Sequence, residues 1–339
     1  MEKIPGFRVV GGASEEVKEK TKQEIELRLT DHIKSLSEAD QKEIKRLEYP
    51  KTEEEYSLIN FANAETNRLR EESGMEPYTI PAENYHIVPP ELFKKVTNSG
   101  SSAMASSMDQ ASVYNANQFR DNPVRFGAAT LHETLHLKGH YAVEVEETEK
   151  EGKKVERRTQ YREGISALAA QKKKDEEGYH SHFDGLHEAI VSEQEKRSFP
   201  NLLALPILKK EKEKLSSAEA RKLAENISKR EGIPVEEIYW VGERENEYNN
   251  FGYGTQRKVL NYVCEEIQRQ FPKRYQSPEE VFKEFLKAQF TGQLLPIARL
   301  VEDTFGEGSF RMLGNMKNDK ESGILALEIL RKARIRTKK

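Results

Sequence analysis

The sequence predicts an α+β fold, in which a small mixed sheet and a few helices are followed by an all-helical C-terminal region. Two features of the sequence predict it. Between residues 75 and 119, the segments MEPYTIPAENYHIVPPELF and ASVYNANQF combine prolines with β-branched and aromatic residues, which is typical of short strands bounded by turns. From about residue 200 onward, apolar residues recur at helical spacing along most of the chain.

Length and composition indicate more than one domain. The chain has 339 residues, of which 33% are charged and 36% hydrophobic, so it can bury a core beneath a heavily charged surface. We expect a charged helical N-terminal arm over residues 1–70, an α+β domain over 71–200 and a helical domain over 201–339.

Charge, cysteine content and hydropathy limit the partners and the compartment expected for this chain. The formal net charge is only −3, which argues against a nucleic-acid partner. The single cysteine, Cys264, excludes a disulfide framework and fits a packed thiol in a reducing compartment. No stretch reaches the roughly 20 apolar residues of a membrane span, and the N-terminus has no signal-like apolar run. We therefore expect a cytoplasmic chain without a membrane partner, and its oligomeric state stays open.

Capping residues define a helix in the middle of the α+β domain. Asp121 or Asn122 can cap it, Pro123 suits its first position, and Gly139 suits a left-handed stop. We expect this helix to run from Pro123 to just before Gly139.

The elements after this helix are predicted from the alternation of polar and apolar residues and from residues that begin or end helices. Polar and apolar residues alternate around Glu151–Gly152, which predicts a hairpin. A second helix is expected from its cap at Asp184 to its boundary at Pro200. Farther along, SSAEARKLAENISKREG and SPEEVFKEFLKAQF each open with a serine in the cap position.

The stretch TLHETLHLKGH, from Thr130 to His140, points to metal chemistry. Residues four apart share a helix face, so His132 and His136 can direct two imidazole nitrogens at one zinc ion. Glu133 is placed to take a proton from water, and this is the H-E-x-x-H arrangement of zinc peptidases. A solvated, histidine-rich helix face is the alternative. Against it, six of the eight histidines lie between residues 132 and 187.

The third ligand distinguishes groups of such peptidases. One group continues the motif as H-E-x-x-H-x-x-G-x-x-H, but Ala142 occupies the last position here. His140 comes two positions early, and on a continued helix it would lie about 12 Å along the axis from His132. It could reach the metal only after a sharp chain reversal.

The segment GLHEAIVSE, from Gly185 to Glu193, resembles the second-helix motif of gluzincin-type zinc metallopeptidases, most closely in their minimal forms. The resemblance covers roughly residues 75–200 and implies a zincin-like catalytic domain with an active-site helix. It implies that Zn²⁺ is held by His132, His136 and Glu188, with His140, His182 and His187 as alternatives to Glu188.

The resemblance departs from the family pattern beside the expected glutamate ligand. His187 stands where the family usually has asparagine. The acidic residue that would orient a ligand histidine comes one place late, as Glu193, and Ser192 occupies its usual position. We expect Ser192 to make a weaker hydrogen bond there.

The resemblance also implies a mechanism and a substrate class. Glu133 would act as the general base in the hydrolysis of peptide bonds by zinc-activated water. A tyrosine or histidine would steady the oxyanion, and the candidates are Tyr161, Tyr179, His180 and His182. The strand ASVYNAN is expected to be the sheet edge where a peptide or protein substrate adds as a further strand.

Two other classes of function compete with a zinc metallopeptidase. A non-catalytic zinc-binding interaction module could be built on the same fold, although such a module has no use for Glu133. A helical scaffold or nucleic-acid adaptor could use the basic segment RKARIRTKK, for which the near-neutral charge is poor support.

Overall fold

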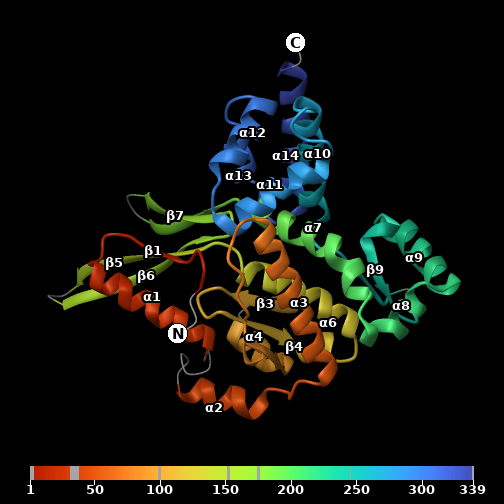
Figure 1. The fold of residues 1–339 in the computed structure, drawn as a ribbon, viewed down its shortest axis with the longest axis horizontal. Coiled ribbons are helices and arrows are strands. Elements are labelled where there is room, and N and C mark those ends of the chain that lie inside the picture. Colours follow the sequence, from red (N-terminus) through yellow and green to blue (C-terminus); the bar gives the residue numbers. More distant parts are fainter. Residues whose placement is uncertain are drawn as a thin grey trace.

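The computed structural model describes residues 4–30, 38–97, 101–150, 153–173, 176–244 and 246–337. Its described part contains many helices and three small sheets (Figure 1). The expectation of a mixed helix and sheet architecture is therefore confirmed.

The N-terminal region packs onto the body of the protein. It contains β1 (Arg8–Val10), α1 (Glu15–Thr30), α2 (Glu38–Leu47) and α3 (Glu53–Glu72). A capping box starts α3, in which Thr52 and Glu55 each bond the backbone of the other. The buried residues of this region include Ile25, Leu29 and Leu58. The segment expected as a charged arm therefore supplies apolar side chains to the core.

A five-stranded sheet has the order β1-β5-β6-β7-β8. The strands after β1 are β5 (Tyr141–Lys150), β6 (Lys153–Glu163), β7 (Ser166–Lys173) and β8 (Glu176–His182). β1 runs parallel to β5 and the other pairs are antiparallel. The hairpin predicted after residue 140 is thus confirmed as β5 and β6, whereas its turn at Glu151–Gly152 lies outside the described residues.

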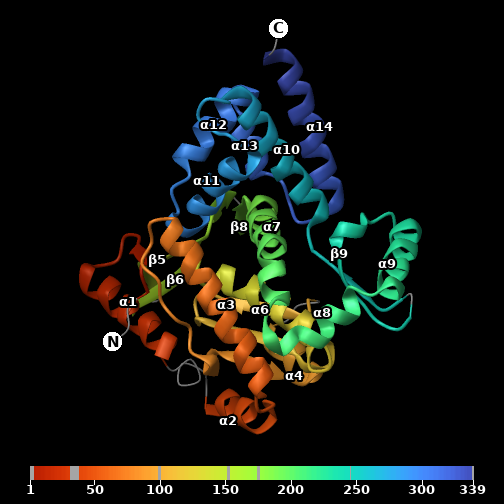
Figure 2. The ribbon, with the colours of Figure 1, turned by 45° about the vertical axis from the view of Figure 1, so that its right-hand side comes forward.

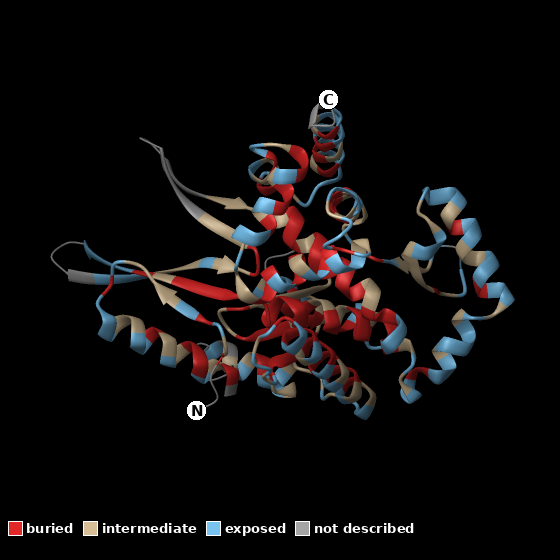
Figure 3. Ribbon diagram, turned by 45° about the horizontal axis from the view of Figure 1, so that its top comes forward, coloured by how far each residue is buried: buried red, intermediate tan, exposed pale blue. Residues whose placement is uncertain are grey.

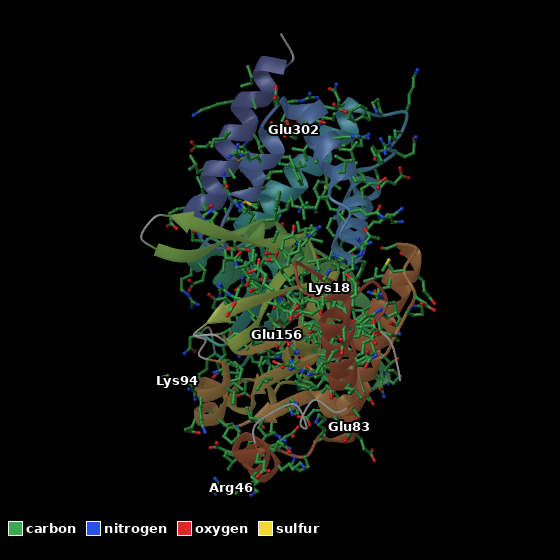
Figure 4. All side chains as sticks on the ribbon, turned by 90° about the vertical axis from the view of Figure 1, so that its left-hand side faces the viewer. Lys18, Arg46, Glu83, Lys94, Glu156 and Glu302 are labelled. Carbon is green, nitrogen blue, oxygen red and sulfur yellow. The ribbon has the colours of Figure 1, made fainter. Side chains whose placement is uncertain are left out.

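Helix α1 runs beside β6. Nη1 of Arg158 lies 2.6 Å from Oε2 of Glu24, and the hydroxyl of Thr21 donates to Glu156 over 3.3 Å. Figure 4 labels Lys18 on this helix and Glu156 on the strand. These polar contacts attach the N-terminal region to the five-stranded sheet.

A three-stranded sheet has the order β2-β4-β3. β2 (Tyr85–Val88) is parallel to β4 (Ala111–Asn115), and β3 (Ala103–Ser106) is antiparallel to β4. The expectation that ASVYNAN forms the sheet edge is wrong, because β4 lies between its two neighbours. The small, polar segment before it folds as β3 and forms an edge.

Helix α6 (Pro123–Leu137) has the predicted beginning but a different end. Oδ1 of Asn122 accepts from the N–H of Arg125, and Pro123 is the first residue, as expected. The left-handed stop at Gly139 is wrong, because Gly139 does not have a positive φ. A Cβ at this position would lie 2.9 Å from Nε2 of Gln289. The glycine therefore allows the Gln289 side chain to lie close to the backbone at residue 139.

Helix α7 (Asp184–Leu203) differs from the prediction at both ends. Asp184 is its first residue, and the preceding Phe183 occupies the cap position in the left-handed conformation. Pro200 lies inside the last turn instead of ending the helix. Leu202, which is fully buried, holds the chain beyond this proline against the core.

The remaining elements are mostly helical. They are α4 (Pro90–Thr97), α5 (Ala116–Phe119), α8 (Lys209–Leu215), α9 (Ala218–Glu231), α10 (Gly254–Gln270), α11 (Pro278–Thr291), α12 (Leu295–Phe305), α13 (Ser309–Gly314) and α14 (Lys320–Thr337). Ser217 and Ser277 cap α9 and α11, which confirms both serine caps.

The expectation of an all-helical C-terminal region is wrong at one place. β9 (Ile238–Val241) and β10 (Tyr248–Asn250) form an antiparallel pair. Together with α8 and α9 they make a lobe over residues 206–250, called the side lobe below, which projects from the body in Figures 1 and 2. The aromatic side chains of IYWV suit a strand, although the helical pattern around them hides it.

The hydrophobic core crosses the boundary expected near residue 200. One cluster of buried side chains includes Leu131 and Leu135 of α6, Ile190 of α7, and residues of α10 to α14 such as Val263 and Phe285. Figure 3 shows this buried centre and the more exposed side lobe. Among the described helices, none combines the length and apolar character that crossing a membrane requires.

Candidate metal centre

Helix α6 carries the two histidines on one face while its other faces are packed. Leu131 and Leu135 are fully buried in the core. A Cβ at Gly127 would lie 2.9 Å from side-chain atoms of both Leu58 on α3 and Leu202 on α7. This glycine therefore lets the helices approach closely, and the packing fixes the direction of the histidine face.

Three potential ligand atoms converge between α6 and α7. Nε2 of His132 and Nε2 of His136 lie 3.2 Å apart. Oε2 of Glu188 lies 3.5 Å from the first nitrogen and 3.4 Å from the second. The three side chains expected to hold a metal are therefore brought together, and they form a group suited to a metal ion.

The shape of this triangle fits zinc. A tetrahedral zinc ion with ligands at roughly 2.0–2.1 Å separates its ligand atoms by about 3.3–3.4 Å. The observed sides are 3.2, 3.4 and 3.5 Å. Within the described part of the chain, Oε2 of Glu188 is buried and has no well-formed hydrogen bond. Two imidazoles and a carboxylate are also ligands that zinc accepts, so the residues fit the group that the resemblance implies.

The outer nitrogens of both histidines have partners. Nδ1 of His132 lies 2.9 Å from Oε2 of Glu195 on α7, and Nδ1 of His136 lies 2.8 Å from Nε2 of His187. Nε2 of His187 also lies 3.2 Å from Nε2 of Gln289 on α11. Such contacts fix the ring orientation of a ligand histidine, and here one of them extends into the C-terminal helices.

Burial and nearby charges shift the pKa values of the side chains in this cluster. Burial disfavours a charge on His132, but the nearby carboxylates of Glu188 and Glu195 outweigh it and raise its pKa well above the ordinary value. Burial likewise opposes charge on Glu188, yet the two histidines lower its pKa well below the ordinary range. Burial and the charge of His136 lower the pKa of His187 to about 3. A metal ion must therefore displace protons from this cluster when it binds.

Glu133 lies beside the triangle and is nearly buried, with 9% of its surface exposed. Burial raises its pKa, and the charges of the two α6 histidines oppose this effect. The backbone of Ala105 on β3 has a smaller effect and lowers the pKa of this carboxyl group. A carboxylate with a raised pKa is suited to accept a proton near neutral pH.

These side chains line one cavity of about 360 Å³. Ala103, Met104 and Ala105 of β3 form part of its wall. Glu163 and Asp184 also line it, and Ser166 and Ser181 donate hydrogen bonds to Asp184. The cavity therefore places the sheet edge and the metal triangle on one surface.

Tyr253 is a further cavity residue, which the sequence analysis missed. Its ring stacks on His132, with centroids 6.2 Å apart and planes at 15°. Burial, together with the charges of the nearby Glu188 and Glu133, raises the pKa of its hydroxyl. The only sequence signal was the local turn FGYG, which carries no metal-binding pattern.

Three of the four residues named from sequence as oxyanion candidates lie away from the cavity. Tyr161 is exposed, and the rings of His180 and His182 on β8 contact each other. None of these three lines the cavity in the described part of the chain. The side chain of Tyr179 lies outside the described residues.

His140 and the two outer residues named on α7 are also placed elsewhere. A Cβ at Gly292 would lie 2.3 Å from Cδ2 of His140, which is buried at the start of β5, and burial lowers its pKa to about 4. Glu193 pairs with Arg197, and Ser192 donates to the carbonyl of Gly252.

Glu195 instead contacts His132. It follows Glu188 by seven residues, which is two helical turns, so this spacing is the signal for Glu195 in the sequence.

Comparison with protein-family models, with curated proteins and with solved structures found no match for this chain.

Proposed function

We propose that this chain is a zinc-dependent metallopeptidase with a zincin-like catalytic unit, working on a peptide or protein substrate in the cytoplasm. The observation that carries the proposal is the triangle of His132, His136 and Glu188, whose sides match tetrahedral zinc, beside the buried Glu133. The single cysteine supports a reducing compartment.

The residues around the triangle can supply the steps of peptide hydrolysis. A zinc ion held there would polarise the peptide carbonyl and make water a better nucleophile. Glu133 takes the proton from that water and then delivers it to the amine nitrogen that leaves. Tyr253 lines the same cavity, and its hydroxyl donates a hydrogen bond to the carbonyl oxygen as that oxygen gains negative charge.

The edge of β3 offers a place for the peptide. The N–H of Asn115 donates to the carbonyl of Ser102 over 2.9 Å. Because hydrogen-bonding groups alternate along antiparallel strands, those of Ala103 and Ala105 face away from β4. An extended peptide can pair with these groups as a further strand, next to Glu133, which lines the same cavity as Ala103 and Ala105.

The test is cleavage of a broad peptide library by the zinc-loaded wild type and by Glu133→Gln. Because the amide cannot accept the proton of water, we expect Glu133→Gln to lose about 10²- to 10⁴-fold in rate while it keeps zinc and fold. Glu91→Gln changes an exposed glutamate on α4 and serves as the matched control with wild-type rates.

Two outcomes contradict the proposal. If the wild type binds zinc but cleaves no peptide, the chain is better explained as a non-catalytic zinc-binding interaction module. Equal rates for wild type and Glu133→Gln would exclude Glu133 as the base.

A further inference from the structure

The backbone of Tyr253 has a conformation that tyrosine rarely adopts. Its φ is 52° and its ψ is 34°, in the left-handed region, and it caps α10 without a side-chain hydrogen bond. In this region the Cβ of a bulky residue crowds the neighbouring backbone, so the surrounding structure must hold the residue there. Strained residues of this kind cluster at functional sites.

Two side chains hold the peptide group that precedes Tyr253. The carbonyl oxygen of Gly252 accepts from Oγ of Ser192 over 3.0 Å and from Nε of Arg257 over 2.9 Å. This oxygen lies in the peptide plane that joins Gly252 to Tyr253, and the rotation between that plane and the tyrosine side chain is the φ angle of Tyr253. Fixing the oxygen fixes this plane, and at the φ that Tyr253 adopts the plane sets the direction in which the tyrosine side chain leaves the backbone.

Arg257 is itself fixed by two carboxylates. It is 2% exposed, and its Nη1 lies 3.4 Å from Oε2 of Glu193 on α7. Its guanidinium also contacts both carboxylate oxygens of Glu237 at the base of the side lobe. A planar guanidinium can bond two carboxylates and a carbonyl at once, which an ammonium cannot do with the same geometry.

The anchors come from the helix that supplies the glutamate ligand. Ser192 and Glu193 follow Glu188 by about one turn of α7. One rigid helix thus sets the position of a ligand carboxylate and, through Arg257, that of the tyrosine whose ring stacks on His132.

We propose that Arg257, assisted by Ser192, is a positioning residue that holds Tyr253 over His132 with its hydroxyl in the cavity. The part of this inference that concerns catalysis rests on the proposed peptidase function. Arg257 touches neither the metal triangle nor the cavity in the described residues; it acts through the turn at residues 251–253.

The first test separates positioning from general stability by a kinetic cycle. Arg257→Lys keeps a cation between the carboxylates but loses the guanidinium geometry, so we expect kcat to fall about tenfold to a hundredfold with KM nearly unchanged. Zinc content should stay at the wild-type level. In the Tyr253→Phe background the same change should cost less than about threefold, since the hydroxyl to be positioned is already gone.

Two further variants support the cycle. Ser192→Ala removes one hydroxyl and no charge, so it provides a milder version of the same change if Arg257→Lys folds poorly. Lys258→Met alters the exposed neighbour of Arg257 and is the matched control, expected to behave as the wild type. Equal losses in the presence and absence of the Tyr253 hydroxyl would overturn the inference.

The second test does not depend on activity. With 3-fluorotyrosine incorporated at position 253, the ¹⁹F resonance of the full chain should shift in Arg257→Lys and in Ser192→Ala, and stay in place in Lys258→Met. An unchanged resonance in both anchor variants would overturn the inference, whether or not any peptide is cleaved. A shift in a protein that cleaves nothing would support the positioning of Tyr253 and contradict only the peptidase proposal.

Discussion

Helices α6 and α7 both face the candidate metal centre, but they make different kinds of contact with it. His132 and His136 on α6 lie four residues apart and converge by helical geometry alone. The contacts of α7 after Glu188 are made with segments remote in sequence. They join Ser192 to Gly252, Glu193 to Arg257 and Glu195 to His132.

The difference distinguishes contacts set by one helix from contacts that require the whole fold. A pair four apart on one helix needs only that helix to form, and its spacing is visible in the sequence. The contacts of α7 exist only when α6, α10 and the side lobe are packed around it. The comparison predicts that changes on α7 will act through several partners, whereas changes on α6 will act directly on the metal.

The largest expected effect is the loss of the glutamate ligand. Glu188→Ala should weaken zinc binding more than the roughly 10- to 100-fold typical of losing an outer hydrogen-bond partner. His140→Ala should leave it nearly unchanged, because this histidine lies beside Gly292 and outside the triangle. Competition with a fluorescent zinc chelator measures both affinities. A greater loss for His140→Ala would place the third ligand on the segment after α6.

An intermediate effect is expected for the outer partner of His132. Glu195→Gln keeps the size of the side chain but loses the charge that orients the imidazole, so zinc affinity should fall about 10- to 100-fold. Glu193→Gln, two residues earlier on α7, should leave zinc affinity close to that of the wild type, since its carboxylate pairs with Arg197 and Arg257. A greater loss of zinc affinity for Glu193→Gln than for Glu195→Gln in the same assay would identify Glu193 as the residue that orients His132.

A smaller effect is expected for the close approach of the two helices. At Gly127 an added methyl group must displace Leu58 and Leu202, which are fully buried. Overpacking costs roughly 1–3 kcal/mol, and the better helix propensity of alanine offsets up to about 1 kcal/mol of it. Gly127→Ala should thus lower the free energy of unfolding by about 1–2 kcal/mol.

Denaturant unfolding measures this change. Gly12→Ala, at a glycine whose added Cβ would meet no atom within 4 Å, is the matched control. Unaltered stability of Gly127→Ala would show that the leucines move aside without cost.

The smallest effect is expected at the single cysteine. Cys264 lies on α10, is 1% exposed, and burial raises the pKa of its thiol. Because the thiolate is the reactive form, an alkylating reagent at mild alkaline pH should leave the folded protein unmodified and its zinc content unchanged. Mass spectrometry before and after denaturation checks this, and rapid modification of the folded chain would contradict the packing of α10.

The parts of the fold that could be predicted are those encoded by neighbouring residues. The cap at Asn122 with Pro123, the serine caps of α9 and α11, and the β5–β6 hairpin each depend on a few adjacent side chains. The β9–β10 pair is not evident from the sequence, because the helical pattern around IYWV hides it, although the two strands lie close together in the chain. The edge position of β3 could not be predicted, because it depends on which remote segments pack beside it.

The same division holds within the candidate site. His132, Glu133 and His136 could be named from their spacing, and Glu188 from a resemblance. Tyr253 could not be named, because its place over His132 depends on a strained turn held by buried charges.

The zinc content of the freshly purified full chain, prepared without chelators, tests the central claim most directly. The geometry of the triangle predicts about one zinc per chain by elemental analysis, because three protein ligands and one open position are typical of a catalytic site. His132→Ala should retain almost none under the same conditions. Finding no zinc in the wild type, or equal zinc in the wild type and His132→Ala, would contradict the assignment of this site as a zinc centre.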